Sequence, residues 1–339
     1  MFTKEIVMDL GTANTRVFIK SKGIILDEPS VVAYDVRDDA VKAVGTDAKE
    51  MIGRTPGSIV AVRPIKGGVI ADFDVTAAMI KLFLRQALRG SLLSKTNLLI
   101  SIPSGATEVE ARAVHDAAKQ AGANEVTLIE GPLAAALGAN LPVYDAAGSM
   151  VVNIGGGTAE AAILSLGGIV TAHSIKVGGD AFDDAVRHYL RKRHGLIVGD
   201  RTAEQLKIDI GSALPYDGEQ NLEIRGRGLV DGLPSVANIS PAELRDAFDD
   251  LTEQIVDLVR ATLEKTPPEL AADIIDRGIT LTGGGAQLRR LDTRISEATG
   301  MPVHIVANPT DCTVLGAGSK IGDSRSVPDF SPYNYRRNK

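Results

Sequence analysis

Two stretches of the chain repeat one pattern of apolar and polar positions. Residues 9–25 read DLGTANTRVFIKSKGII and residues 153–169 read NIGGGTAEAAILSLGGI, and at a constant offset of 144 residues five positions are identical. Each stretch predicts a strand, a tight turn of small and polar residues, a second strand and another glycine turn. Repetition of this pattern at a fixed offset predicts two related halves, each with a hairpin tip.

Helices are predicted where apolar residues recur with a helical period behind a capping sequence. Thr107 and Glu110 form a capping box for one helix, which Gly122 ends as a C-cap. Ser240 and Glu243 form a second box for a long helix, which two prolines at 267–268 end. The apolar face of the first helix is expected to hold Val109, Ala113, Val114, Ala117 and Ala121. The apolar face of the second helix is expected to hold Leu244, Phe248, Leu251, Ile255, Leu258 and Thr262.

The other segments complete a chain in which strands alternate with helices. LLISIPSG at 98–105 predicts a buried strand, and EVTLIEGPLAAALGANL at 125–141 predicts a strand, a turn and an alanine-rich helix. GITLTGGGAQLRRL at 278–291 predicts a strand, a third glycine turn and a helix N-terminus, a geometry that attracts anions. Residues 44–73 are rich in turns and predict a small inserted subdomain. The alternation as a whole predicts an α/β chain.

Composition and charge narrow the class of protein. With 339 residues, 44% hydrophobic and 24% charged, the sequence predicts an ordinary globular protein of two domains. The net charge of −6 disfavours a nucleic-acid-binding protein. The single cysteine, and a start that enters a strand without a signal-peptide core, favour a reducing cytoplasm. No apolar stretch is long enough to span a membrane, and the five histidines show no metal-ligand spacing.

The hairpin tips have a chemistry suited to phosphate. Glycine lets a backbone approach an anion closely, and successive N–H groups in a turn form a concave anion site. The hydroxyls of Thr12 and Thr158 and the amide of Asn14 could add side-chain donors. Two such tips facing each other would hold a polyphosphate from both sides, whereas each tip taken alone is as well explained by a structural hairpin.

An ordered set of motifs resembles the actin/Hsp70/sugar-kinase superfamily, and more closely the bacterial actins of the MreB and Mbl family. The set comprises DLGTANT, EPSVVA, GRTPGSIVAVRPIKGGVIADF, IPSGATEVEARAV, GPLAAALG, GGGT, VGGDAFD, TAEQLK and TPPELAADIIDRGITLTGGGAQL, over residues 5–320. The resemblance implies two RNase-H-like α/β domains, each with an inserted subdomain, around a cleft that holds ATP and Mg²⁺.

The resemblance also implies a division of the chain. The first domain is expected at 1–145 with its inserted subdomain at about 33–75. The second is expected at 146–320 with its inserted subdomain at about 184–245, and the segment 308–320 is expected to pack back on the first domain. The polar residues 321–339 are expected to form a disordered tail.

The nucleotide contacts follow by resemblance, motif by motif. Asp9 is expected to hold the magnesium through water. The first phosphate loop is expected to be Thr12, Ala13 and Asn14, and the second Gly155, Gly156, Gly157 and Thr158. The cleft floor is expected at Gly178, Gly179 and Asp180. The nucleoside is expected to meet two segments: Glu204, Gln205, Leu206 and Lys207, of which Glu204 and Lys207 contact ribose and base, and Gly284, Gly285, Ala286 and Gln287. A surface ion pair is the other interpretation of Glu204 and Lys207, which lie three residues apart.

Four residues depart from the family pattern at or beside the cleft. Asn153 stands where the family has aspartate, and the loss of charge predicts weaker magnesium binding. Gly131 stands where the family has the glutamate that positions the attacking water, and Ala159 replaces a hydroxyl residue near the γ-phosphate. Glu130 is expected to point to the opposite face of its strand. Gln287 is a change nearer the nucleoside. These departures predict slow hydrolysis, and they fit equally a paralogue released from turnover and one selected for a long-lived ATP state.

The resemblance implies a cytoplasmic protein that forms head-to-tail filaments at the membrane and helps determine cell shape by organising cell-wall synthesis. Its partners would be further copies of itself, a standard MreB paralogue and wall-synthesis proteins. Leu92 and Leu93, flanked by basic residues, form a candidate membrane loop, although a helix end packed inward explains them equally. Two alternatives remain: a fully active ATPase in which another group replaces Gly131, and a non-polymerising regulatory paralogue. An Hsp70-like chaperone domain or a sugar kinase is disfavoured by the MreB-specific blocks.

Overall fold

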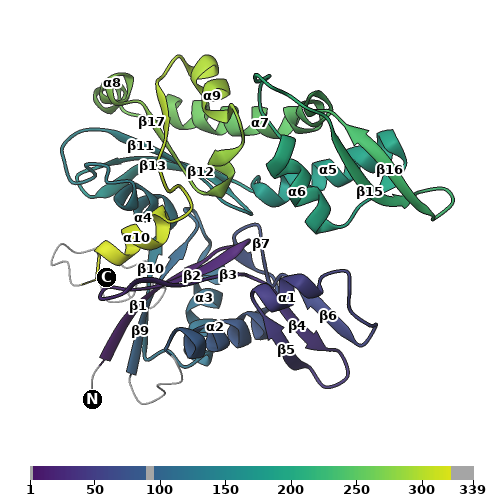
Figure 1. The fold of residues 1–339 in the computed structure, drawn as a ribbon. Coiled ribbons are helices and arrows are strands. Elements are labelled where there is room, and N and C mark those ends of the chain that lie inside the picture. Colours follow the sequence, from purple (N-terminus) through teal and green to yellow (C-terminus); the bar gives the residue numbers. More distant parts are fainter. Residues whose placement is uncertain (1–2, 89–94, 322–339) are drawn as a thin grey trace.

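Two five-stranded sheets with the same strand order form the centre of this computed structural model, which describes residues 3–88 and 95–321 (Figure 1). In each sheet three consecutive strands form an antiparallel meander, and the first of them also pairs in parallel with a strand from much later in the chain. The first sheet has the order β10-β9-β1-β2-β3: Glu125–Glu130, Lys95–Ile102, Thr3–Leu10, Asn14–Ile19 and Gly23–Pro29. The second has the order β13-β12-β11-β17-β18: Gly168–Ile175, Ala159–Ser165, Ser149–Ile154, Ile279–Thr282 and Val303–Ile305.

The sequence repeat is therefore a repeat of topology. In the first hairpin Asp9 pairs with Arg16, and in the second Asn153 pairs with Glu160, so both pairs keep the offset of 144 residues. Directly opposed residues of antiparallel strands point to the same face of the sheet. The prediction of two related halves, each with a hairpin tip, is confirmed.

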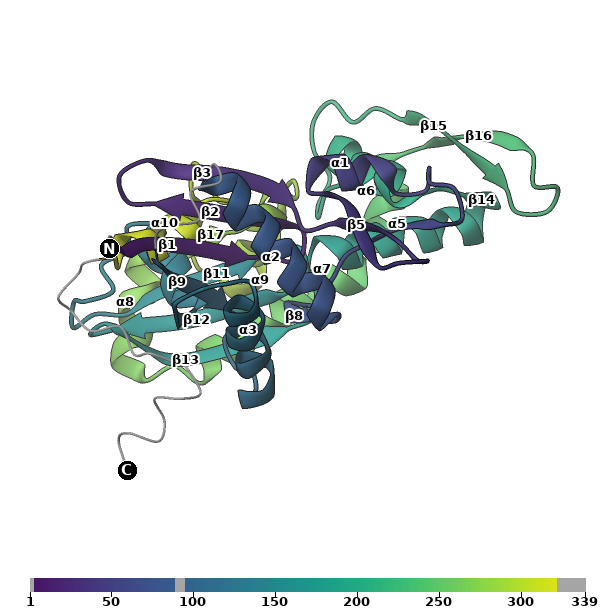
Figure 2. The ribbon, with the colours of Figure 1, turned by 90° about the horizontal axis from the view of Figure 1, so that it is seen from below.

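Two short helices lie between the sheets and join them (Figure 1). Figure 2 shows the second of them, α10, beside β1 and β2. They are α4 (Gly131–Gly138) and α10 (Cys312–Ser319), which pack against each other, with α10 also on β1 and β2 and α4 on β11 and β12. A Cβ at Gly138 or Gly316 would overlap the backbone of the other helix, so glycine at these positions allows the close approach. Apolar residues of both sheets, including Val7 and Val151, share one buried cluster with these helices.

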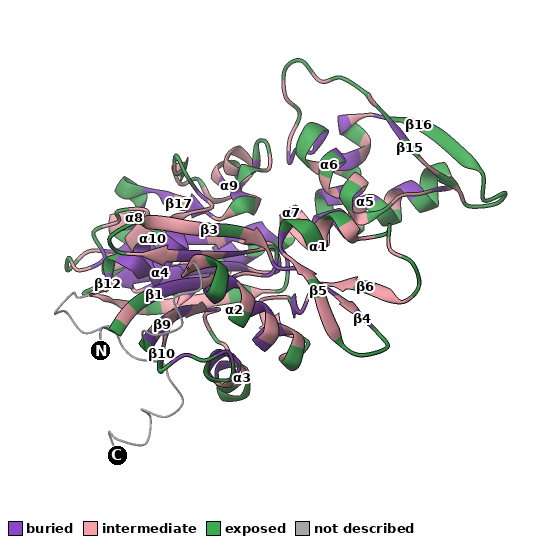
Figure 3. Ribbon diagram, turned by 60° about the horizontal axis from the view of Figure 1, so that its bottom comes forward, coloured by how far each residue is buried: buried purple, intermediate pink, exposed green. Residues whose placement is uncertain are grey.

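The outer faces of the sheets are covered by longer helices (Figure 3). On the first sheet α2 (Phe73–Ala87) and α3 (Glu108–Gln120) enclose a core with β1 and β9. On the second sheet α7 (Pro241–Glu264) crosses β12 and β13 and packs against α5 (Gly179–His194) and α9 (Leu291–Thr299). The helix α8 (Pro268–Arg277) contacts β11.

Smaller sheets project on the same side of both halves (Figure 1). One unit holds α1 (Thr46–Met51) and the sheet β5-β4-β6, at Ala40–Val44, Val32–Asp35 and Ile59–Val62. The pair β7 and β8, at Ile65–Lys66 and Val69–Ile70, follows it. The other unit holds α6 (Asp200–Ile210) and the sheet β14-β15-β16, at Leu196–Ile197, Leu222–Gly228 and Pro234–Ile239.

Some predictions from local sequence patterns are confirmed and others are not. Both capping boxes are confirmed, with each hydroxyl accepting the N3 backbone N–H and each glutamate accepting the N-cap N–H. On α3, however, Val109, in the first turn, is 79% exposed rather than on the buried face. Val114, Ala117 and Ala121 are buried as predicted, and Ala113 is half-buried. The buried face also holds Ala111, His115 and Ala118. The predicted strand and helix N-terminus are both present in 278–291, but a 3₁₀ turn, Gly284–Gln287, follows the third glycine turn and α9 begins only at Leu291.

The membrane predictions fall largely outside the described residues. Leu92 and Leu93 lie in the segment 89–94, and the predicted tail beyond residue 321 lies in 322–339; neither segment is described. Within 3–88 and 95–321, no helix is both long and apolar enough to cross a membrane.

Candidate functional site

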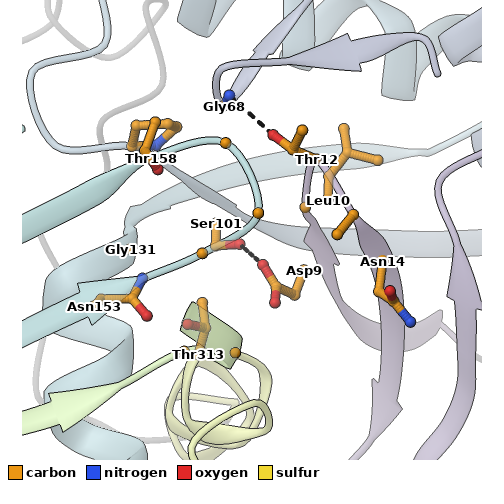
Figure 4. A pocket seen from close by; sticks show the side chains of 18 of the residues that line it. Asp9, Leu10, Thr12, Asn14, Gly68, Ser101, Gly131, Asn153, Thr158 and Thr313 are labelled. Atoms are coloured by element: carbon orange, nitrogen blue, oxygen red, sulfur yellow. Dashed lines mark hydrogen bonds between the residues drawn. The ribbon is translucent and has the colours of Figure 1, made fainter. Parts of the chain in front are cut away.

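A cavity lies where the two halves meet at their hairpin tips (Figure 4). Its walls come from the β1–β2 hairpin, the end of β9, the start of α4, the β11–β12 hairpin, the third glycine turn and the start of α10. We call Thr12, Ala13 and Asn14 the first tip, and Gly155 to Thr158 the second tip. Every residue of both tips lines the cavity, together with Asp9.

The two tips are in direct contact. A Cβ at Gly156 would lie 2.7 Å from the Cβ of Ala13, and a Cβ at Gly157 would lie 2.9 Å from the backbone nitrogen of Gly68. The Gly68 N–H donates to the Thr12 hydroxyl at 3.0 Å, which ties the first tip to the turn between β7 and β8. Because the backbones approach each other so closely here, Gly156 and Gly157 cannot be replaced by residues with a side chain without a clash.

The start of α5 packs against the second tip. The N–H of Gly179 donates to the carbonyl of Gly155 at 3.0 Å, and the N–H of Asp180 donates to that of Gly156 at 2.8 Å. The predicted cleft floor is thus beside the predicted phosphate loop. Gly178 also packs here, since a Cβ at this position would overlap the backbone of the second tip.

Asp9 is a half-buried carboxyl group that faces the cavity. The Ser101 hydroxyl donates to its Oδ1 at 2.7 Å. Burial raises the pKa of Asp9, and the hydrogen bond from Ser101 and the charge of Arg16 only partly oppose this. A carboxylate in such a place is stabilised by a nearby cation. Magnesium is commonly bound by one carboxylate with waters and phosphates completing its shell, so Asp9 fits that ion. No cluster of three acidic, histidine or cysteine side chains that could hold a metal occurs among residues 3–88 and 95–321.

Asn153 and Glu160 form the corresponding pair of the second half. The Asn153 amide oxygen accepts from the Thr282 hydroxyl at 3.2 Å, and its side chain also hydrogen-bonds Glu160. The Glu160 carboxyl is 3% exposed, and its Oε1 accepts the N–H of Ser104 at 2.5 Å. Burial raises the pKa of Glu160 to about 8, against the opposing effect of the Ser104 N–H. Glu160 is absent from the residues predicted from the sequence, although its position opposite Asn153 in the repeat could have identified it.

Gly131 lies next to this carboxyl group. A Cβ at Gly131 would lie 3.1 Å from Oε2 of Glu160. Glu160 therefore borders the space that a side chain at position 131 would enter. The adjacent Glu130 is not among the described residues that line the cavity, and its Oε1 accepts from the Ser104 hydroxyl at 3.3 Å. Burial raises the pKa of Glu130 as well.

The α6 residues lie outside the cavity lining, and each has a different partner. Glu204 forms an ion pair with Lys49 of α1 at 2.8 Å. Lys207 forms one with Asp183 at 2.8 Å and donates to the carbonyl of Gly179 at 3.1 Å. The two therefore do not pair with each other. Gln205 is exposed and donates to Asp209, and the Leu206 side chain is buried in the apolar core of the second half.

The third glycine turn reaches the cavity at one end only. Gly283 and Gly284 line it, whereas Gly285 packs against the Ile154 side chain. Ala286 is fully buried in the core, and Gln287 is exposed. The structure thus brings Gly284 to the two tips, and places the side chains of Ala286 and Gln287 elsewhere because the chain turns in a 3₁₀ conformation here.

Solved structures place this architecture in the actin-like class. MreB5 of Spiroplasma citri bound to AMPPNP matches with a TM-score of 0.88 at 38% identity, covering 95% of this chain and 96% of that chain. The same protein bound to ADP matches with a TM-score of 0.88 at 37% identity, covering 99% of each chain. A MamK double helical filament, at 19% identity and a TM-score of 0.81 over 95% of this chain and 99% of that chain, shares the fold. The α/β actin-like fold predicted from the sequence is confirmed.

Sequence comparison identifies the family within that class. A family model described as MreB/Mbl protein matches residues 3–327. The cell shape-determining protein MreB of Escherichia coli (strain K12) is 48% identical over 328 residues, which cover 95% of this chain and 94% of that protein. The cell shape-determining protein Mbl of Bacillus subtilis (strain 168) is 45% identical over 328 residues, covering 97% and 98%. The chain belongs to the MreB/Mbl family of cell shape-determining bacterial actins.

Proposed function

We propose that the chain binds ATP in the cavity, with the phosphates held by the two tips. The observation that carries this proposal is the direct contact of the two tips beside Asp9, which concentrates backbone N–H groups and hydroxyls from both halves at one point. The related MreB5 of Spiroplasma citri, crystallised with AMPPNP and with ADP, supports the choice of nucleotide.

Asp9 would hold a magnesium ion through water, and the ion would supply positive charge to the phosphates. Asn153 contributes an uncharged amide on the other wall, and its oxygen already accepts a hydrogen bond from Thr282. With one carboxylate in place of two, the affinity for the ion is lower than an aspartate at 153 would give.

Hydrolysis of the bound ATP is slow in this proposal. Phosphoryl transfer depends on a positioned water and on electrostatic stabilisation of the transferred group. Gly131 offers no side chain for that water, and Ala159 is fully buried and offers no hydroxyl. Contacts of Glu204 and Lys207 with the ribose and base, and of Gly284 with the nucleoside, also belong to this proposal.

At the level of the cell, the protein assembles head to tail into filaments at the cytoplasmic face of the membrane. These filaments would organise cell-wall synthesis together with a standard MreB paralogue and wall-synthesis proteins. Heterologous contacts that do not close a ring generate such filaments. Membership of a family of cell shape-determining proteins supports this role, and Leu92 and Leu93 are the proposed membrane contact.

Two experiments test the parts of this proposal separately. A titration of purified protein with ATP, with and without Mg²⁺, is expected to show one saturable site whose affinity rises when the ion is present. Sedimentation with AMPPNP, with and without anionic vesicles, is expected to pellet the protein. Absence of saturable binding would contradict the nucleotide site. Protein that binds AMPPNP and stays in the supernatant under every condition would favour the non-polymerising regulatory paralogue.

A further inference from the structure

Glu160 is a buried acidic residue that lines the cavity. The family resemblance implies no role for it. It stands opposite Asn153 in the second hairpin, on the face that lines the cavity. Its counterpart in the first half is Arg16, which stands opposite Asp9 and lines the same cavity. The repeat therefore directs one basic and one acidic side chain into the cavity from equivalent positions.

The position of Glu160 is related to the missing side chain at 131. Oε2 of Glu160 lies 3.1 Å from the site of a Cβ at Gly131, the place where the family has a glutamate. Oε1 is held by the N–H of Ser104, which fixes the plane of the carboxyl group and leaves Oε2 on the side of Gly131. Gly131 has no positive φ, so its backbone conformation does not require glycine. What glycine provides here is space beside the Glu160 carboxyl.

We propose that Glu160 is the general base of this cleft, orienting the attacking water from the space that Gly131 leaves free and taking its proton. In this step the water oxygen forms a bond to the terminal phosphorus of ATP, and the bond from that phosphorus to the bridging oxygen of ADP breaks. The bridging oxygen keeps the electron pair, and the water proton passes to Oε2 of Glu160. The inference rests on the proposed function, since it needs ATP in the cavity.

Because of its surroundings, only a small fraction of the Glu160 carboxyl is ionised at neutral pH. Burial keeps its carboxyl protonated up to about pH 8, which is its raised pKa. The hydrogen bonds from Ser104 and Asn153 oppose that shift, whereas the negative charges of Glu130 and Asp9 add to it. Only the ionised form can accept a proton, so hydrolysis is slow at pH 7 and rises toward pH 8 and above. Slow turnover and a retained base are thus compatible.

The test compares Glu160→Gln with Glu130→Gln and the wild-type protein. Glu130 is a neighbouring carboxyl group outside the cavity lining, so its variant is a matched control. For each protein AMPPNP affinity is measured by calorimetry, and phosphate release is measured in a single turnover between pH 6 and pH 9. Folding is checked by circular dichroism. Glutamine keeps an oxygen for the Ser104 N–H, so the variant retains that contact.

We expect the AMPPNP affinity of Glu160→Gln to be within about threefold of that of wild type. A general base acts in the transition state of hydrolysis, and binding of AMPPNP does not involve that state. The variant's phosphate release should fall by at least about tenfold, at the low end of general-base contributions, and should lose its rise with pH. Glu130→Gln should keep a pH-dependent rate whose midpoint moves to lower pH, because one negative charge near Glu160 has been removed.

Three results would overturn the inference, and they differ in what they say of the nucleotide site. If Glu160→Gln binds AMPPNP and releases phosphate like wild type, Glu160 is not the base. If wild type binds AMPPNP and shows no hydrolysis above background even at pH 9, the cleft has no working base. If Glu160→Gln folds and loses AMPPNP affinity, the carboxyl group serves binding. Failure of wild type itself to bind AMPPNP would instead remove the proposed function, and this inference with it.

Discussion

Lys49 of α1 and Glu204 of α6 form an ion pair of 2.8 Å that connects the small-sheet units of the two halves. Arg63 and Asp180 form a second connection at 2.7 Å. Burial by itself would raise the pKa of Glu204, but the hydrogen bond and charge of Lys49, with Lys207 and Arg63, outweigh it and lower the pKa. The acidic members of both pairs are residues for which the family resemblance implies nucleotide contacts, so under the proposed function the side chains that connect the two halves would also contact the nucleotide.

Breaking the Lys49 pair should speed nucleotide exchange. A partly exposed ion pair contributes on the order of 1 kcal/mol or less. Lys49→Gln is therefore expected to raise the dissociation rate of a fluorescent ATP analogue by about two- to fivefold. Lys42→Gln is the control, because Lys42 contacts Asp35 within its own small sheet. Equal exchange rates in the two variants would show that the Lys49 pair does not restrain opening.

The contact between the tips can be tested at Gly156. Its Cβ would lie 2.7 Å from that of Ala13, so Gly156→Ala forces the tips apart, and overpacking of this kind costs about 1–3 kcal/mol. We expect a lower melting temperature and at least about a tenfold loss of ATP affinity. Gly168→Ala should leave both unchanged, because that site is open. Normal ATP affinity in Gly156→Ala would place the phosphates away from the tips.

Restoring a carboxylate at 153 should couple stability to magnesium. Asn153→Asp adds a negative charge next to the buried Glu160 carboxyl and opposite Asp9 across the cavity. The expected result is a lower melting temperature without ligand and a larger increase with MgATP than wild type shows. The measurement is differential scanning fluorimetry with EDTA, with Mg²⁺ and with MgATP. An increase no larger than that of wild type would mean that position 153 does not affect the ion.

The raised pKa of Glu160 predicts a pH dependence of stability without nucleotide. Its ordinary pKa is 4.5 and its folded value is about 8, so between these values the folded state binds more protons than the unfolded state. Stability from this group is full below pH 4.5 and is lost as the pH rises toward 8. The melting temperature of Glu160→Gln relative to wild type should therefore increase from pH 5 to pH 8, by several degrees. A constant difference between the two proteins over this range would contradict the shifted pKa.

The parts of the fold that the sequence could predict were those with a repeated or local signal. The offset between the two hairpins predicted paired strands and opposed tips, because strand periodicity and glycine turns are local properties. The capping boxes at Thr107 and Ser240 were equally local. Helical spacing alone predicts Val109 on the buried face, but spacing does not say which residues of that stripe the sheet covers, and Val109 is exposed.

The site was less predictable where partners come from distant segments. Nothing in the neighbourhood of Glu204 indicates that Lys49 would meet it, since the contact depends on how the two halves pack. The motif as a whole predicts a nucleotide contact for Leu206, but the helical period turns its side chain into the core with those of Ala203 and Ile210. The repeat places Glu160 opposite Asn153, but the space beside Gly131 is shown only by the packing of β12 against α4.

The most direct test of the account is single-turnover phosphate release at saturating MgATP, compared between wild type and the double variant Gly131→Glu/Asn153→Asp. The account predicts that wild type binds one ATP per chain and that the double variant releases phosphate at least about tenfold faster at pH 7, because a positioned carboxylate and a second acidic wall are restored. Wild-type release as fast as that of the double variant, with ATP bound in both, would contradict the claim that this cleft holds ATP and cuts it slowly.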